Sequence, residues 1–266
     1  MKKILYSTFL FYLWIIPLAV FAAEENPYAV PESRMERPWW KHQYEVFVEQ
    51  LNQAQDVDVL LLGDQTFTEW FSIKWLRPNY EKNFKDLVCI NMSMGGNRPC
   101  NLLWMLGNAP MQKISPKVVI IYIGQNLLYS DVPFYNDDQK AVLRQLAQSI
   151  QLCAEKAAAL YPQAEIKLLA ILPFNRDPFS QERYRGDFVN SQLAKWNQNN
   201  SRIELIDMNP VILNENGKWL GKSEWDATNK YWENMRSLGY TYLCEQAKVE
   251  ELKQKKVQNQ NDNQTK

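Results

Sequence analysis

Residues 60–66 read LLLGDQT, and this stretch decides the fold class of the chain. The stretch begins inside a compact apolar run, 57–62, which shows no regular alternation with polar residues and is typical of a parallel strand buried on both faces. Gly63 ends the run, and helical spacing of apolar residues begins at Phe67. A buried strand that turns directly into a helix is the first half of a βα unit and indicates an α/β protein.

The same pattern repeats along the chain without any linker that would separate two domains. The predicted strands are 57–62, 87–92, 117–123, 166–172 and 203–208. The predicted helices are 39–53, 67–76, 101–106, 138–160, 188–196 and 235–252. This alternation predicts a single-domain, three-layer α/β/α sandwich with a parallel sheet. In such sheets, ligands bind beyond the carboxyl ends of the strands, which directs attention to Gly63, Asn91 and Gly124.

Three further blocks carry unusual residues at positions comparable to 60–66. The stretch 91–97 reads NMSMGGN, the stretch 119–126 reads VIIYIGQN, and 226–229 reads DATN shortly before the C-terminal helix. Together, in this order, the four blocks resemble those of the SGNH (GDSL-type) hydrolases, and most closely the branch of platelet-activating-factor acetylhydrolase catalytic subunits. The resemblance covers roughly 39–246 and implies a flavodoxin-like sheet.

The resemblance assigns a role to one residue in each block. The family's nucleophilic serine falls on Gln65, and the histidine base falls on Asn229. The backbone N–H of Gly96 and the side-chain amide of Asn126 fall on the two donors of the oxyanion hole. Asp226 falls on the carboxylate that orients the base. Two of the five positions therefore carry a residue that departs from the family pattern.

These two replacements remove the chemistry of acyl transfer. A carboxamide at Gln65 is neither acidic nor usefully nucleophilic, and Asn229 has no group that titrates near neutral pH. We therefore expect a pseudoenzyme that binds without catalysis, with an acylated glycan as an example of its ligand. The expected ligand-binding residues are Asp64, Gln65, Gly96, Asn126, Asn229 and Trp225. We expect Asp64 to brace its loop by hydrogen bonds.

Two other functions stay open. An active esterase would need displaced catalytic residues, of which Ser93 with His42, the single histidine of the chain, is the conceivable pair. Thr66 and Thr68 also carry hydroxyl groups, but no base is evident beside them. Alternatively, the old pocket is filled by side chains and the protein has a structural or partner-binding role. The absence of a cavity at Gln65 would favour this last hypothesis.

The N-terminus predicts export. Two lysines precede an apolar run that ends at Ala22, in the form of a secretory signal peptide over 1–22. We therefore expect a secreted or periplasmic protein, with the hydrolase-like domain over 39–252. The competing interpretation is an uncleaved membrane anchor. The Gln-, Asn- and Lys-rich segment 253–266 predicts a disordered tail.

Composition excludes several classes of partner. Basic and acidic residues each number 30, so no basic excess is present to bind nucleic acid. The spacing of the cysteines is not that of a metal site, and no Gly-x-Gly-x-x-Gly pattern follows a strand, so we expect neither a metal nor a nucleotide cofactor. An oxidising compartment would permit disulfides, but the sequence cannot choose a pairing. The cysteines are Cys89, Cys100, Cys153 and Cys244.

Overall fold

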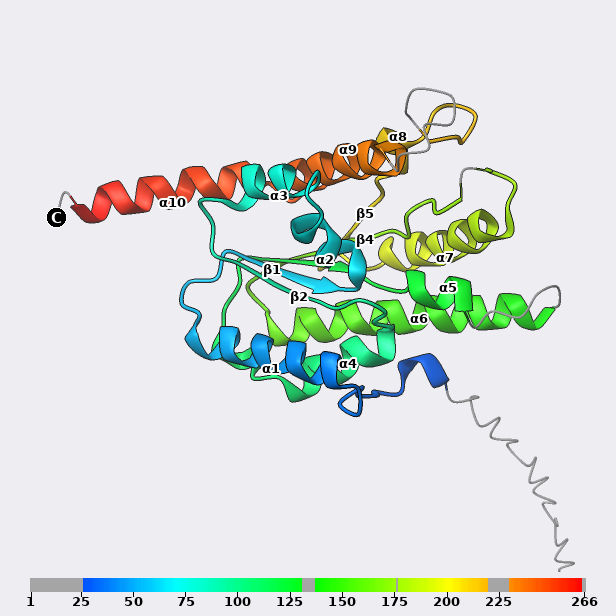
Figure 1. Ribbon diagram of the computed structural model, residues 1–266, viewed down its shortest axis with the longest axis horizontal. Coiled ribbons are helices and arrows are strands. Elements are labelled where there is room, and N and C mark those ends of the chain that lie inside the picture. The colour runs from blue at the N-terminus through cyan, green and yellow to red at the C-terminus, as the bar shows by residue number, and fades with distance from the viewer. Residues whose placement is uncertain (1–25, 131–136, 176, 220–229, 265–266) are drawn as a thin grey trace, which may run out of the picture.

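The computed structural model describes residues 26–130, 137–175, 177–219 and 230–264 (Figure 1). The predicted signal peptide and the block 226–229 lie outside these residues. The strands are β1 Val59–Gly63, β2 Cys89–Ser93, β3 Val118–Tyr122, β4 Glu165–Leu169 and β5 Ile203–Ile206. All pair in parallel, in the order β2-β1-β3-β4-β5. This is the flavodoxin-like order, so the predicted fold class is confirmed.

Helices cover both faces of the sheet, as Figure 1 shows. One face packs against α1 Pro38–Gln53, α4 Pro99–Asn108, α6 Asp137–Leu160 and α7 Gln181–Asn197. The other packs against α2 Gln65–Ser72, α3 Arg77–Phe84, α8 Asn209–Ile212, α9 Lys230–Gln246 and α10 Val249–Gln264. The remaining helical segments are α5 Gln125–Ser130 and the 3-10 turns Pro27–Ala29 and Met111–Lys113.

The central strands show why no alternation appears in the sequence. In β1, Leu60 and Leu62 join the core on the α1 face, whereas Val59 and Leu61 join the core on the α2 face. All five residues of β1 are buried. A strand covered on both faces needs apolar side chains at every position, which is the pattern that predicted it.

Some boundaries differ from the sequence predictions. The predicted helix 67–76 ends earlier, at Ser72, and Pro78 lies in the first turn of the separate helix α3, where its missing N–H costs nothing. Helix α7 begins at Gln181, before the expected residue Phe188, because the Ser180 hydroxyl caps it by accepting from the Arg183 N–H. The short helix α5 was not predicted.

The segment 253–266, for which the sequence predicted a disordered tail, is helical in the structure as far as Gln264, where α10 ends. The expected helix 235–252 is instead two helices, separated at Lys248, whose φ is 51°. Tertiary contacts hold α10 against the domain. Lys253 Nζ donates to the Lys82 carbonyl at 2.8 Å, and Lys256 Nζ lies 2.8 Å from Asp58 Oδ2. These contacts compensate for a composition that alone favours disorder.

Asp58 anchors both α10 and the start of β3 at the end of the sheet opposite the candidate site. Its fully buried carboxylate accepts from Lys117 Nζ at 2.7 Å, Lys256 Nζ at 2.8 Å and the Val88 N–H at 2.9 Å. Burial alone raises the pKa of Asp58, but these hydrogen bonds and the charge of Lys117 outweigh it and hold the pKa below its ordinary value. The ionised form is therefore the one that the fold stabilises.

We expect Asp58→Asn to lower the free energy of unfolding at pH 7 by roughly 1–3 kcal/mol, because two cations lose their buried partner. A folded-state pKa below the unfolded value of about 3.9 stabilises the fold above that pH, and the effect is lost as pH falls through the folded-state pKa. Denaturant unfolding of both proteins should thus show that the difference between their free energies of unfolding becomes smaller as the pH is lowered from 7 to 3.

The control is Glu81→Gln. It removes an exposed ion pair, in which Glu81 Oε1 lies 4.0 Å from Arg77 Nε, and it should change the free energy of unfolding by less than about 0.5 kcal/mol. A difference between wild type and Asp58→Asn that stays constant across this pH range would contradict the assignment.

Candidate functional site

The candidate site lies where the loops after β1, β2 and β3 meet. Gly63, the last residue of β1, is paired in register with Ser93 at the end of β2 and with Tyr122 at the end of β3. The three following loops therefore start side by side, at the point of the sheet where the strand order reverses. They bring together Gln65, Gly96 and Asn126.

Gln65 is the first residue of α2, and its side chain points back across the ends of the strands. Its Oε1 accepts a hydrogen bond from the Gly96 N–H at 3.1 Å and another from Asn126 Nδ2 at 2.9 Å. Its Nε2 donates to Asn126 Oδ1 at 3.0 Å. The two carboxamides thus form a reciprocal pair, with the glycine N–H as a third point of attachment.

This arrangement places a carbonyl oxygen of the protein between the two groups assigned to an oxyanion hole. An oxyanion hole consists of donors aimed at the oxygen of a reacting carbonyl. Here, the donors of Gly96 and Asn126 converge on Gln65 Oε1. The carboxamide of Gln65 therefore occupies the position that the resemblance would give to an ester carbonyl, and a ligand carbonyl could reach both donors only after displacing it.

A buried amide supports the Gly96 loop. Asn97 is fully buried, its Nδ2 donates to the Gly63 carbonyl at 3.3 Å, and its Oδ1 accepts from Trp40 Nε1 at 3.0 Å. Its backbone carbonyl accepts from Asn126 Nδ2 at 2.9 Å. Asn97 therefore ties the loop after β2 to β1, to α1 and to the loop after β3. The sequence prediction missed this residue, although it directly follows the Gly-Gly pair.

Arg34 holds the same loop from outside. Gly96 has a φ of +71°, which few residues other than glycine adopt without strain, and its carbonyl accepts from Arg34 Nη1 at 2.7 Å. Arg34 belongs to the irregular segment before α1, and no sequence pattern marked it as part of the site.

Asp64 is fully buried and lies at the N-cap of α2. Its Oδ1 accepts from the Thr66 N–H at 2.9 Å, which satisfies one of the free N–H groups at the start of the helix. Tyr240 supports the same turn, because its hydroxyl donates to the Thr66 carbonyl at 2.7 Å. In the structure, Asp64 therefore stabilises the turn between β1 and α2 through a hydrogen bond to its backbone.

The structure does not bring the alternative pair together. The Ser93 hydroxyl donates to Asn91 Oδ1 at 2.5 Å and lies 2.9 Å from the Thr68 hydroxyl, so neither of its neighbours is a base. His42 is exposed on α1 and is not among these neighbours. Nothing in this geometry would activate Ser93 as a nucleophile.

Two tryptophans follow Gln65 in the sequence, and they differ in exposure. Trp70 is fully buried and stacks on Tyr240 with ring centroids 4.1 Å apart, so it is a core residue. Trp75 is 61% exposed. Three of the expected site residues lie outside the described residues: Trp225, Asp226 and Asn229.

The cysteines are not cross-linked: Cys89, Cys100, Cys153 and Cys244 are all free thiols. Within the described ranges, no three His, Cys, Asp or Glu side chains gather in a way that would hold a metal ion. No helix among those residues has the length and apolar character needed to cross a membrane.

The relatives of the chain include subunits of platelet-activating factor acetylhydrolases. The chain is 26% identical over 200 residues to the human platelet-activating factor acetylhydrolase IB subunit alpha2, and the match covers 73% of this chain and 79% of the human one. It is 24% identical over 164 residues to the rat alpha1 subunit, covering 60% of this chain and 62% of that subunit. No protein-family model matches the chain.

A solved structure shares the fold. It belongs to a protein from Streptococcus pneumonia described as a candidate platelet activating factor, and it superposes with a TM-score of 0.51 at 19% identity. The match covers 77% of this chain and 92% of that protein.

Proposed function

We infer that this chain, which its relatives and its fold assign to the SGNH (GDSL-type) hydrolase family, is a secreted member of that family that does not hydrolyse esters. The names of its mammalian relatives describe acetylhydrolases. Our proposal is that the present chain keeps their scaffold and has lost their chemistry.

The observation that carries this proposal is the position of the Gln65 side chain. Replacement of a serine nucleophile by glutamine removes the attacking hydroxyl. In addition, the longer side chain fills the oxyanion hole with its own carbonyl oxygen, 3.1 Å from the Gly96 nitrogen and 2.9 Å from Asn126 Nδ2. In this proposal, glutamine in place of serine removes the nucleophile and also occupies the two hydrogen-bond donors that would stabilise an oxyanion.

The same contacts restrict which ligands the old site would bind. An acylated glycan or another acyl ligand would have to compete with a carboxamide that is tethered in place and makes hydrogen bonds to Gly96 and Asn126. Such a tethered group acts as a competitor of high effective concentration. We therefore favour a partner-binding role over the binding of an acyl ligand between the donors.

The proposal of secretion rests on a separate feature, the signal-peptide pattern of residues 1–22.

The test is hydrolysis of p-nitrophenyl acetate and butyrate by the purified chain without residues 1–22. We expect wild type to release p-nitrophenol no faster than a heat-denatured sample. Ser93→Ala and His42→Ala are expected to behave as wild type, because neither residue has the partner that catalysis requires. Measurable wild-type turnover that either variant abolishes would replace the present proposal with an esterase that uses displaced residues.

A further inference from the structure

Within the described part of the chain, β2 pairs with β1 alone and so forms one edge of the sheet. Its sequence, CINMS, contains neither a charged residue nor proline, which are the common means by which proteins protect an edge strand from further pairing. The outer edge of β2 therefore merits attention as a place where another chain could bind.

The pairing with β1 fixes which backbone groups of β2 point outward. The Val88 carbonyl accepts from the N–H groups of Asp58 and Val59, and the Met94 N–H donates to the Gly63 carbonyl. Even-numbered residues of this segment thus direct their backbone groups toward β1. Because these directions alternate along a strand, the groups of the odd-numbered residues point to the outer edge.

Local side chains satisfy the outward groups of only one of these residues. The Ser93 N–H donates to Asn91 Oδ1 at 3.0 Å, and the Ser93 carbonyl accepts from Thr68 Oγ1 at 3.1 Å. The backbone N–H and carbonyl groups of Cys89 and Asn91 make no hydrogen bond with any other described part of the chain. Cys89 and Asn91, which are two positions apart, therefore present unpaired backbone N–H and carbonyl groups at the spacing with which an added strand would form hydrogen bonds.

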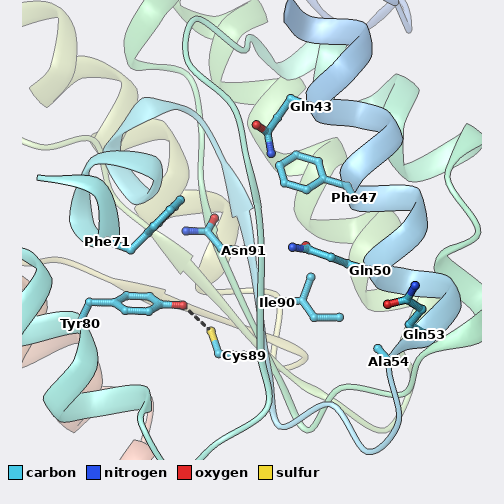
Figure 2. Close-up of a pocket in the computed structure, with 10 residues that line it drawn as sticks. All are labelled: Gln43, Phe47, Gln50, Gln53, Ala54, Phe71, Tyr80, Cys89, Ile90 and Asn91. Atoms are coloured by element: carbon cyan, nitrogen blue, oxygen red, sulfur yellow. Dashed lines mark hydrogen bonds between the residues drawn. The ribbon is translucent and has the colours of Figure 1, made fainter.

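Cys89 and Asn91, the residues that carry these groups, line a groove with a volume of 580 Å³ (Figure 2). Side chains of α1 form one wall, and side chains of α2 and α3 form the other, as the close-up shows. The wall on α1 carries Gln43, Phe47, Gln50 and Gln53, and the opposite wall carries Phe71 and Tyr80.

The lining of the groove is uncharged. None of its residues is Asp, Glu, Lys, Arg or His. Burial raises the pKa of Cys89 to about 12, so its thiol, which accepts a hydrogen bond from the Tyr80 hydroxyl at 3.4 Å, is neutral at physiological pH. Aromatic rings and glutamine amides offer contacts to apolar side chains and to peptide groups, but no counter-ion for a charged ligand.

The groove continues along the strand in both directions. A further hollow of 200 Å³ shares Phe47 and Asn91 with it and extends to Gly95, beside the loop that carries Gly96. On the other side, a hollow of 440 Å³ shares Tyr80 and Cys89 and extends to Leu87; its lining includes one residue of each charge, Glu81 and Lys85, so the uncharged lining is that of the central groove. Hollows thus follow the outer side of β2 from Leu87 to Gly95, and the unpaired backbone groups lie in the central groove at Cys89 and Asn91.

We propose that this groove binds an extended, uncharged peptide segment of a partner protein, which pairs with Cys89 and Asn91 as a sixth strand of the sheet. Neighbouring strands lie about 4.8 Å apart, so the guest backbone would lie between the walls, with its alternate side chains directed toward α1 and toward α2 and α3. This interaction surface is distinct from the Gln65 site and does not depend on whether the chain is catalytic.

The recessed position of the strand argues against a second copy of this chain as the occupant. The β2 edge lies between the walls formed by Phe47 on α1 and Phe71 on α2. In a symmetric dimer, the β2 edge of the other copy would lie between the same walls. The helices of the two copies would therefore meet before their strands did, whereas a single extended segment fits.

The test uses a phage-displayed library of random seven-residue peptides and the wild-type chain without residues 1–22. Enriched peptides are synthesised with a fluorescent label and titrated with each variant. Gln50→Arg places a long charged side chain at the groove from an exposed position, and we expect it to weaken binding at least about tenfold. The matched control is Gln254→Arg, the same change at an exposed position of α10, which should leave binding unchanged.

A second pair of variants tests the backbone contact itself. Asn91→Ala and Asn91→Pro lose the same side-chain hydrogen bonds, but the proline variant also loses the outward N–H. Peptide binding should be weaker in Asn91→Pro than in Asn91→Ala. In wild type, bound peptide should slow amide hydrogen exchange at Cys89 and Asn91, which should exchange faster than Ile90 and Met92 in the free protein.

Four results would overturn the proposal. The first is that the library yields no enriched peptide, and the second is that enriched peptides bind wild type and Gln50→Arg equally well. The third is that wild type forms a dimer and Gln50→Arg dissociates it. The fourth is that wild type binds a cello-oligosaccharide and Gln50→Arg does not. The third would make a second copy the occupant, and the fourth would make it a carbohydrate.

Discussion

Gly63→Ala is expected to lower the free energy of unfolding by about 4 kcal/mol or more, which would leave little folded protein at 37 °C. A Cβ atom at this position would lie 2.1 Å from the backbone carbonyl oxygen of Tyr122. That oxygen belongs to β3, the strand paired with β1, so it cannot move aside without breaking the ladder. Thermal unfolding followed by circular dichroism would measure the loss.

The matched control is Gly107→Ala. Gly107 is an exposed residue of α4, and a Cβ atom there would meet only the Nζ and Cε end of the flexible Lys156 side chain, with Nζ at 3.0 Å. Alanine is favoured over glycine by roughly 0.5–1 kcal/mol in a helix interior and by less in the last turn of α4, where Gly107 lies, so this variant should be as stable as wild type or slightly more stable. Equal stability of Gly63→Ala and wild type would show that β1 and β3 do not approach as described.

The sequence predicted the fold because the physical signals for the sheet are local. An apolar strand such as 57–62 must be buried on both faces, and this requirement is visible without any tertiary contact. Helices that depend on tertiary contacts were predicted less well. The polar composition of 253–266 predicts disorder, and only the contacts of Lys253 and Lys256 with distant residues explain why α10 forms.

The candidate site divides in the same way. The position of Gln65 after a buried strand could be predicted, and so could its lack of a nucleophilic group. The direction of its side chain could not, because the contacts with Gly96 and Asn126 join residues that are 31 and 61 positions apart. Asn97 and Arg34 were missed for the same reason, since they act through distant backbone groups that no sequence pattern reports.

The second large effect is a gain of activity. Gln65→Ser combined with Asn229→His should raise p-nitrophenyl acetate hydrolysis about 10²–10⁴-fold above wild type. Serine is too short to reach Gly96 and Asn126 as the glutamine does, so both donors become free for an ester carbonyl. Histidine in the block 226–229 would supply the base, with Asp226 as its orienting carboxylate by resemblance to the family.

Three related variants separate the contributions. Gln65→Ala frees the two donors without adding a hydroxyl and should remain inactive. Gln65→Ser alone lacks a base, and Asn229→His alone lacks a nucleophile, so each should gain far less than the double variant because the pair acts as a unit. Circular dichroism would verify that every variant is folded before its rate is compared.

The measurement that tests the central claim most directly is the initial rate of p-nitrophenyl acetate hydrolysis by wild type, Gln65→Ala and the double variant in parallel. Our account predicts no turnover above background in the first two proteins and clear turnover in the third, because only the chemistry at Gln65 and Asn229 has been removed from the scaffold. Wild-type turnover that Gln65→Ala leaves unchanged would contradict it, since catalysis would then take place elsewhere in the protein.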